Sequence, residues 1–324
     1  MGAHTESADG HAVDCIEGQQ SAVSAIQLPG VACLTQTSIG STVRRDDAPT
    51  EAAGRNSKND CSETRSPTAI SVRCLEQLDR VLSWTAKHGL WAIITARASL
   101  AAGEARPGYA TRTVFDTPEL QASFLRMWST VAARCKHFDF VAGYEVLSEP
   151  RVKPDKVPDD VVRSFYTSAC TAVLRADPRT PCIIGAAPFY DRSRLESVVL
   201  SGFHNQIIYN FNFFVPRAYV DASNKLANQY PTRLRCCDAL SHAKCCAQWE
   251  HGCCDRMVQI DAAFLEQELK APLAFSQSRA VPIFLDQWGV SYNSGPGRLQ
   301  YVSDMLELLQ VTHRVPMYVA GAAS

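Results

Sequence analysis

The sequence predicts an α/β fold, a TIM-type (β/α)8 barrel that is either complete or open at its N-terminal end. From Ser71 onward, segments with helical spacing of apolar residues alternate with short apolar runs typical of buried strands. Strands that alternate with helices form a parallel sheet covered by helices. The chain has 324 residues, 46% of them hydrophobic, and can therefore bury one large core.

The elements follow one another in a regular order. The first helix spans Val72 to His88, where the apolar residues recur at helical spacing and Gly89 provides a stop. The further helices are expected at 120–135, 161–175, 193–199, 261–269 and 297–311. The strands are expected at 90–96, 140–147, 181–186, 206–214, 281–285 and 315–320.

This order gives six strand-helix units, whereas a closed barrel needs eight. Two short β-like runs, Ala22–Leu28 and Val31–Gln36, precede them. Either these runs supply the first two strands, or the barrel is open on one side and exposes two strand edges.

The remaining N-terminal segment differs from the barrel region in composition. Residues 1–68 are rich in Ser, Thr, Asp, Gly and Asn, and 44–67 contain almost no apolar residues. We expect 1–68 to be mostly disordered. Residues 69–324 should form the barrel, with a cysteine-rich insertion at about 221–260.

Charge and hydropathy exclude several classes of partner. A net charge of −1 and a pI near 6.7 provide no basic field for nucleic acid. No apolar run is long enough to span a membrane, because the stretch 90–102 is interrupted by Arg97. The polar N-terminus lacks the pattern of a secretory signal, and no motif indicates a cofactor.

Six of the 13 cysteines form three adjacent pairs, at 236–237, 245–246 and 253–254. They could form disulfides that staple a long loop, bind zinc together with His242 and His251, or remain free thiols. Disulfides would indicate an oxidising compartment, which conflicts with the absence of a recognisable signal, so the localisation stays open. Because the total is odd, at least one thiol stays free or pairs between chains.

The segment 141–151 suggests the position of a functional acid. Tyr144, Val146 and Ser148 alternate with Glu145, Leu147 and Glu149, so Glu145 and Glu149 should face the same side of the strand. Pro150 ends the strand directly after Glu149. Glu149 is therefore expected at the carboxyl mouth of a barrel strand, although an ordinary strand can also end in an acid.

Four segments together resemble glycoside hydrolase family 5, the cellulase-type retaining hydrolases. The match covers about 75–320, and the segments are 78–94, 143–151, 208–216 and 282–290. The resemblance implies that Glu149 is the acid/base and that Gln287 occupies the place of the nucleophile. The first two strands of the family, with their arginine-bearing segment, have no counterpart.

Gln287 is the main departure from that family, because a retaining mechanism needs a carboxylate there. Asp286 is adjacent, but strand alternation points it to the opposite face unless a bulge intervenes. Where the family has asparagine before the acid/base, and His and Tyr on its sixth strand, this chain has Ser148, Asn212 and Phe214.

Four aromatic residues are candidates for stacking on sugar, although each could equally be a core residue: Tyr144, Phe214, Trp288 and Tyr318. The resulting function hypotheses are a glycoside hydrolase acting on a β-glucan-like or glycoconjugate substrate, a carbohydrate-binding pseudoenzyme, and a decayed product without a stable fold. None of them requires a metal.

Overall fold

The fold is described from a computed structural model. It describes residues 23–28, 70, 72–97, 114–152, 154–203, 205–221, 229–240, 242–248, 252–311 and 317–319. Apart from 23–28, the predicted disordered segment 1–68 lies outside these ranges, and so does the strand expected at Val31–Gln36.

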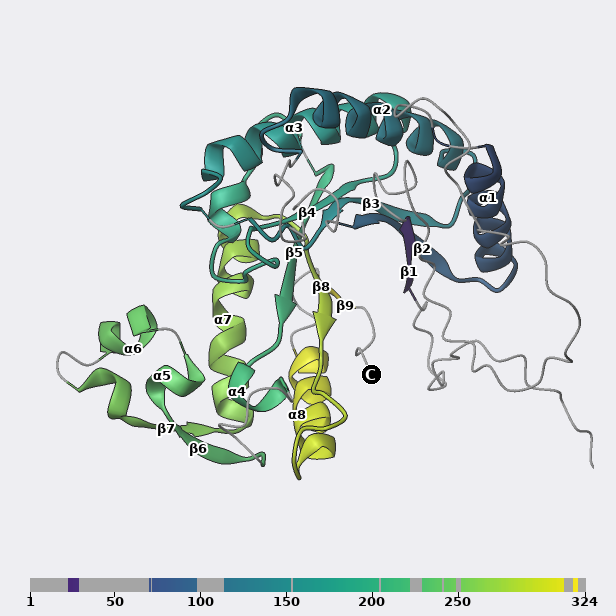
Figure 1. The fold of residues 1–324 in the computed structure, drawn as a ribbon. Coiled ribbons are helices and arrows are strands. Elements are labelled where there is room, and N and C mark those ends of the chain that lie inside the picture. Colours follow the sequence, from purple (N-terminus) through teal and green to yellow (C-terminus); the bar gives the residue numbers. More distant parts are fainter. Residues whose placement is uncertain are drawn as a thin grey trace, which may run out of the picture.

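Seven parallel strands form one curved sheet (Figure 1). Its order is β1-β2-β3-β4-β5-β8-β9, and all of its pairings are parallel. The strands are β1 (Val23–Leu28), β2 (Trp91–Arg97), β3 (Val141–Ser148), β4 (Cys182–Gly185), β5 (Ile207–Phe213), β8 (Ile283–Trp288) and β9 (Met317–Val319). Within the described ranges, no pairing joins β1 to β9. The predicted fold class, an incomplete barrel, is confirmed.

The first of the two uncertain N-terminal runs is part of this sheet. β1 pairs in parallel with β2 over six residues, from Val23 beside Trp91 to Leu28 beside Ala96. β1 therefore lies next to β2, which is the first strand that the alternating pattern predicts.

Helices cover the outer face of the sheet (Figure 1). They are α1 (Val72–Lys87), α2 (Pro118–Cys135), α3 (Asp159–Ala176), α4 (Arg217–Val220), α7 (Ala262–Arg279) and α8 (Arg298–Val311), with a short 3-10 turn, η2 (Leu195–Val198). No helix in the described part of the chain is long and apolar enough to cross a membrane.

Helix α7 is longer than its sequence predicts. Its start is capped, because the Asp261 side chain accepts a hydrogen bond of 3.2 Å from the backbone N–H of Phe264. The helix was expected to end near Leu269, but it continues through Pro272 to Arg279. Pro272 is buried, so packing in the core outweighs the lost backbone hydrogen bond.

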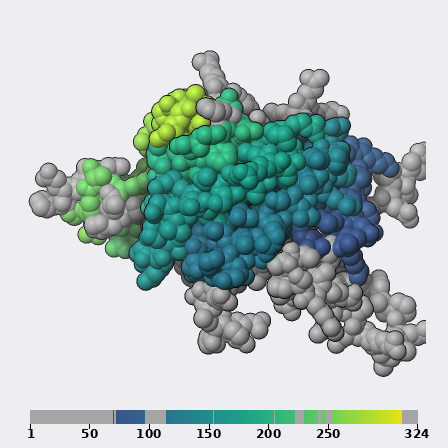
Figure 2. All heavy atoms as spheres, turned by 90° about the horizontal axis from the view of Figure 1, so that it is seen from above, coloured from purple at the N-terminus to yellow at the C-terminus, as the bar shows by residue number. Residues whose placement is uncertain are grey.

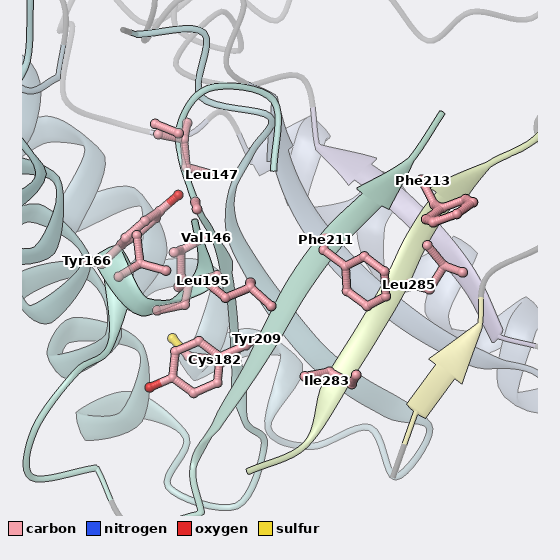
Figure 3. Packing of buried hydrophobic residues seen from close by; sticks show 14 of the residues in the cluster. Val146, Leu147, Tyr166, Cys182, Leu195, Tyr209, Phe211, Phe213, Ile283 and Leu285 are labelled. Carbon is pink, nitrogen blue, oxygen red and sulfur yellow. The ribbon is translucent and has the colours of Figure 1, made fainter. Parts of the chain in front are cut away.

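Alternation along the strands separates two apolar layers. Tyr209, Phe211 and Phe213 of β5 lie beside Ile283 and Leu285 of β8 in the large core between sheet and helices (Figure 3). A second, smaller cluster takes one residue each from β2, β4, β5 and β8 and fills the inside of the curve: Ile93, Ile183, Ile208 and Phe284. The inner face is therefore apolar only near the strand starts.

The cysteine-rich insertion forms a lobe that projects from the barrel (Figures 1 and 2). It contains an antiparallel pair, β6 (Thr232–Arg235) and β7 (Met257–Ile260), with α5 (Cys236–Ala239), α6 (His242–Gln248) and η3 (Cys253–Asp255) between them. All six clustered cysteines are in disulfides, which join 236 to 245, 237 to 254 and 246 to 253. They are therefore unavailable as zinc ligands, and the zinc alternative is wrong.

The remaining described cysteines lie in the barrel. Cys74 on α1 is also in a disulfide. Cys135, Cys170 and Cys182 are free and buried.

An ion cluster ties the lobe to the barrel. Glu268 on α7 is 7% exposed and accepts a hydrogen bond from Arg192 and one of 2.8 Å from Lys244 of the lobe. The Tyr230 hydroxyl also donates to Asp304 of α8 at 2.6 Å. The lobe therefore has polar anchors on two barrel helices.

Candidate functional site

The inward-facing residues of the barrel become more polar toward the carboxyl ends of the strands. On β5 these are Ile208, Asn210 and Asn212, which alternate with the outward aromatics. Ile208 belongs to the apolar cluster, Asn210 donates to Glu145 at 3.1 Å, and Asn212 donates to Glu149. The candidate site therefore lies on a polar layer at the carboxyl mouth, where barrel enzymes place their chemistry.

Glu149 lies at the end of β3 and is partly exposed. The Asn212 Nδ2 atom donates to its Oε1 atom at 2.5 Å, which fixes the carboxyl group across the mouth from β3 to β5. The backbone φ of Glu149 is 48°, in the left-handed region that non-glycine residues rarely adopt. Such conformations concentrate at functional sites, because the surrounding structure must hold them.

The end of β8 contains a β-bulge at Asp286 and Gln287. Phe211 pairs with Leu285 and Phe213 with Trp288, so Asp286 and Gln287 together oppose Asn212 alone. Asp286 follows the inward Phe284, and the Gln287 amide donates to Asp286 Oδ2 at 3.3 Å. Asp286 therefore lies on the inner face by alternation from Phe284, and the expectation that it points to the opposite face is wrong.

Asp286 and Glu145 form a buried acidic pair beneath the mouth, 9% and 2% exposed. Burial, and next the negative charge of Asp286, raise the pKa of Glu145 to about 8, and the nearby hydroxyl groups of Thr95 and Tyr190 oppose this rise. Burial also raises the pKa of Asp286, against hydrogen bonds with Gln287, Asn210 and Glu145. Because burial raises the pKa of both carboxyl groups, and the charge of Asp286 further raises that of Glu145, protonated forms of this pair are favoured over the doubly ionised form.

Two predicted stacking residues are core residues instead. Tyr144 is fully buried on the outer face, where its hydroxyl donates to Asp177 at 2.9 Å and its ring meets Trp128 edge-on. Trp288 is 2% exposed and belongs to the same large core. Neither ring is accessible to a sugar, since both alternate outward from the inner face.

The three other residues predicted to bind substrate are Ser148, Phe214 and Tyr318. Ser148 is 4% exposed and ends β3 beside Arg97. Phe214 is 38% exposed directly after β5, at the same mouth as Asn212. Tyr318 lies on β9, but its side chain is outside what the structure describes.

Sequence reasoning missed the support of the acidic pair. Asn210 and Tyr190 have no motif, but they contact Glu145 because parallel register brings β3, β4 and β5 side by side. The inward spacing of Asn210 and Asn212 on β5 was the available signal. Among the described residues, no group of three or more His, Cys, Asp or Glu is arranged to hold a metal ion.

A cavity of about 470 Å³ lies at the opposite end of the barrel. Trp91, Val141 and Pro181, at or next to the strand starts, line it together with the inner apolar cluster. It lacks the carboxyl groups of the mouth and lies away from Glu149, so it does not qualify as the site of glycosidic chemistry.

Solved structures with a similar fold include endoglucanases. The endoglucanase Cel5A from Thermotoga maritima aligns with a TM-score of 0.58 and 17% identity over 79% of this chain and 72% of that one. The fold is an incomplete (β/α)8 barrel like that of these neighbours. A cellulose synthase subunit Z from Clostridioides difficile gives 0.56 and 15%, over 79% and 74%. A Cel5A complex with mannotriose gives 0.56 and 17%, over 81% and 74%.

Comparisons at the level of sequence add no support for a family. No family model matches the chain, and no curated protein matches it. The resemblance to glycoside hydrolase family 5 is therefore supported by the fold.

Proposed function

We propose that the chain is a glycoside hydrolase of the cellulase type that acts on a β-glucan-like or glycoconjugate substrate, with Glu149 as the proton donor. The observation that carries the proposal is the Glu149 carboxyl group, partly exposed at the mouth and held by Asn212 at 2.5 Å. Asn212 Oδ1 is buried and has no hydrogen-bond partner among the described residues, so it can accept a bond from a sugar hydroxyl. Structural neighbours have been solved with mannotriose and with cellobiose.

Hydrolysis requires a second carboxylate, which the Gln287 amide cannot supply. Asp286 is the candidate, because it lies two residues after the inward Phe284 and therefore on the inner face, and hydrogen bonds from Gln287 and Asn210 favour its ionised form. Asp286 has a shorter side chain than glutamate and precedes Gln287 by one residue, so in this proposal it acts through a water molecule. The water attacks the anomeric carbon and gives its proton to Asp286, while Glu149 protonates the departing oxygen. This sequence inverts the anomeric configuration.

A carbohydrate-binding pseudoenzyme is the second candidate. The specific observation in its favour is Gln287 itself, which occupies the place of the nucleophile and donates to Asp286. In that case the mouth binds the sugar chain and no bond is broken.

The test is hydrolysis of a panel of aryl β-glycosides and β-glucans by purified protein, with the anomer of the product followed by NMR. We expect turnover that Glu149→Gln reduces by at least about a hundredfold, since positioned proton transfer contributes about 10² to 10⁴ in rate. Equal turnover by wild type and Glu149→Gln would refute the role of Glu149. Binding without turnover, together with a gain of hydrolysis in Gln287→Glu, would establish the pseudoenzyme.

A further inference from the structure

The loop after β4 presents an exposed aromatic ring in an unusual conformation. Phe189 is 50% exposed, whereas its neighbour Tyr190 is fully buried. Both have a left-handed backbone, with φ of 56° and 55°. Two consecutive bulky residues in that region are unfavourable, so the surrounding structure must hold them there.

Tyr190 anchors the loop inside the barrel. Its hydroxyl donates to the Leu147 carbonyl at 2.6 Å, and its ring fills the space above Gly185. A Cβ atom at Gly185 would lie 2.3 Å from the Tyr190 ring, so only glycine admits this ring. The Tyr190 carbonyl accepts a bond of 3.0 Å from the backbone N–H of Asn212. The loop is therefore fixed to β3 and to β5.

These anchors place Phe189 beside Glu149. The backbone N–H of Phe189 donates to the carbonyl of Pro150 at 3.0 Å, one residue after Glu149. The Glu149 carboxyl group reaches Asn212 across the end of β4, and Phe189 follows that same strand. The Arg151 guanidinium carbon lies 5.9 Å from the centre of the Phe189 ring. An apolar face and a cationic hydrogen-bond donor therefore adjoin the candidate acid.

We propose that Phe189 is a stacking platform for one sugar ring of a β-linked glucan, next to the bond that Glu149 would cleave. A pyranose with equatorial hydroxyls carries its C–H groups on its two faces and its polar groups at its edge. The faces match the flat face of the Phe189 ring opposite to the one over which Arg151 lies. A ring that is already held in place loses little conformational entropy on binding.

This inference rests on the binding part of the proposed function and is independent of hydrolysis. Calorimetric titration with cellotetraose in a Glu149→Gln background measures it directly, because that background removes turnover. Phe189→Ala should weaken the binding about tenfold or more, while Phe189→Trp should retain it. The matched control is Trp84→Ala, since Trp84 is 55% exposed on α1, on the outer face of the barrel. We expect it to leave the affinity unchanged.

The outcomes separate this inference from the proposed function. If Phe189→Ala binds cellotetraose as tightly as its parent, with an unchanged melting temperature, the platform is refuted and the hydrolase proposal stands. If neither the parent nor Phe189→Trp binds a β-glucan, both are refuted. Should Phe189→Ala unfold, the folded Phe189→Trp variant decides, because a stacking role requires it to bind.

Discussion

Replacing Glu145 by glutamine should change how stability depends on pH. Glu145 faces Thr95 from β2, Tyr190 from the loop after β4, Asn210 from β5 and Asp286 from β8, with Glu149 on its own strand. Burial and the charge of Asp286 raise its pKa in the folded protein from 4.5 to about 8. Glutamine has nearly the same shape and no proton to lose.

The sign and size of this pH dependence follow from the linkage between proton binding and folding. Between pH 4.5 and 8 the folded protein holds a proton on Glu145 that the unfolded chain has released, so the free energy of unfolding falls as the pH rises. A tenfold change in proton affinity corresponds to about 1.4 kcal/mol, which gives a total loss of about 5 kcal/mol across this window. The stability is fully present below pH 4.5, and the loss is complete above pH 8.

Urea denaturation at half-unit steps from pH 4.5 to 8.5 tests this prediction. Wild type and Glu145→Gln should be similar near pH 4.5, and the variant should become the more stable by several kcal/mol at pH 8. Glu266→Gln, at an exposed position on α7, is the matched control for other titrating groups and should follow wild type. Parallel curves for wild type and Glu145→Gln would refute the buried acidic pair.

Three further predictions concern the core and the lobe. Tyr144→Phe removes a buried hydrogen bond to Asp177 and should lower the free energy of unfolding in urea by about 2 kcal/mol. The affinity for cellotetraose, measured by calorimetry, should not change. A clear loss of affinity would instead show that Tyr144 is a binding residue. Glu268→Ala should lower the free energy of unfolding by about 3 kcal/mol or more, because it leaves the largely buried Arg192 without its carboxylate partner. A loss below about 1 kcal/mol in the same urea denaturation would contradict this prediction. Reduction of the disulfides should make the lobe at 229–260 sensitive to limited proteolysis before the barrel. Each crosslink closes a loop of 7 to 17 residues and contributes about 3 kcal/mol to the free energy of unfolding. Equal cleavage rates of the lobe with and without reductant would count against this prediction.

Alternating patterns predict the order of the elements well. The helix at Val72 and the strands at 90–96 and 140–147 agree with α1, β2 and β3 within one or two residues. In these segments the local period and the tertiary burial favour the same structure. Helix α7 is the exception, because the proline signal at Pro272 is local and the packing that overrides it is not.

The candidate site is only partly predictable, because its geometry depends on irregular backbone. Glu149 could be placed from the strand pattern and Pro150, and Asn212 from the resemblance. Asp286 faces inward because it lies two residues after the inward Phe284, but the face of β8 that turns inward, and the bulge at Asp286 and Gln287, depend on pairing with β5, which no single segment encodes. Alternation along 141–151 already places Tyr144 on the face opposite Glu149, whereas Trp288 follows the bulge, so only its pairing with Phe213 shows that it faces the core.

The most direct test of the account compares Asp286→Asn and Gln287→Glu with wild type in the hydrolysis of the best substrate. If Asp286 is the second carboxylate, Asp286→Asn should lose at least about a hundredfold in kcat while still binding cellotetraose, and Gln287→Glu should give no gain. Full activity in Asp286→Asn, or a large gain in Gln287→Glu from an inactive wild type, would contradict the account.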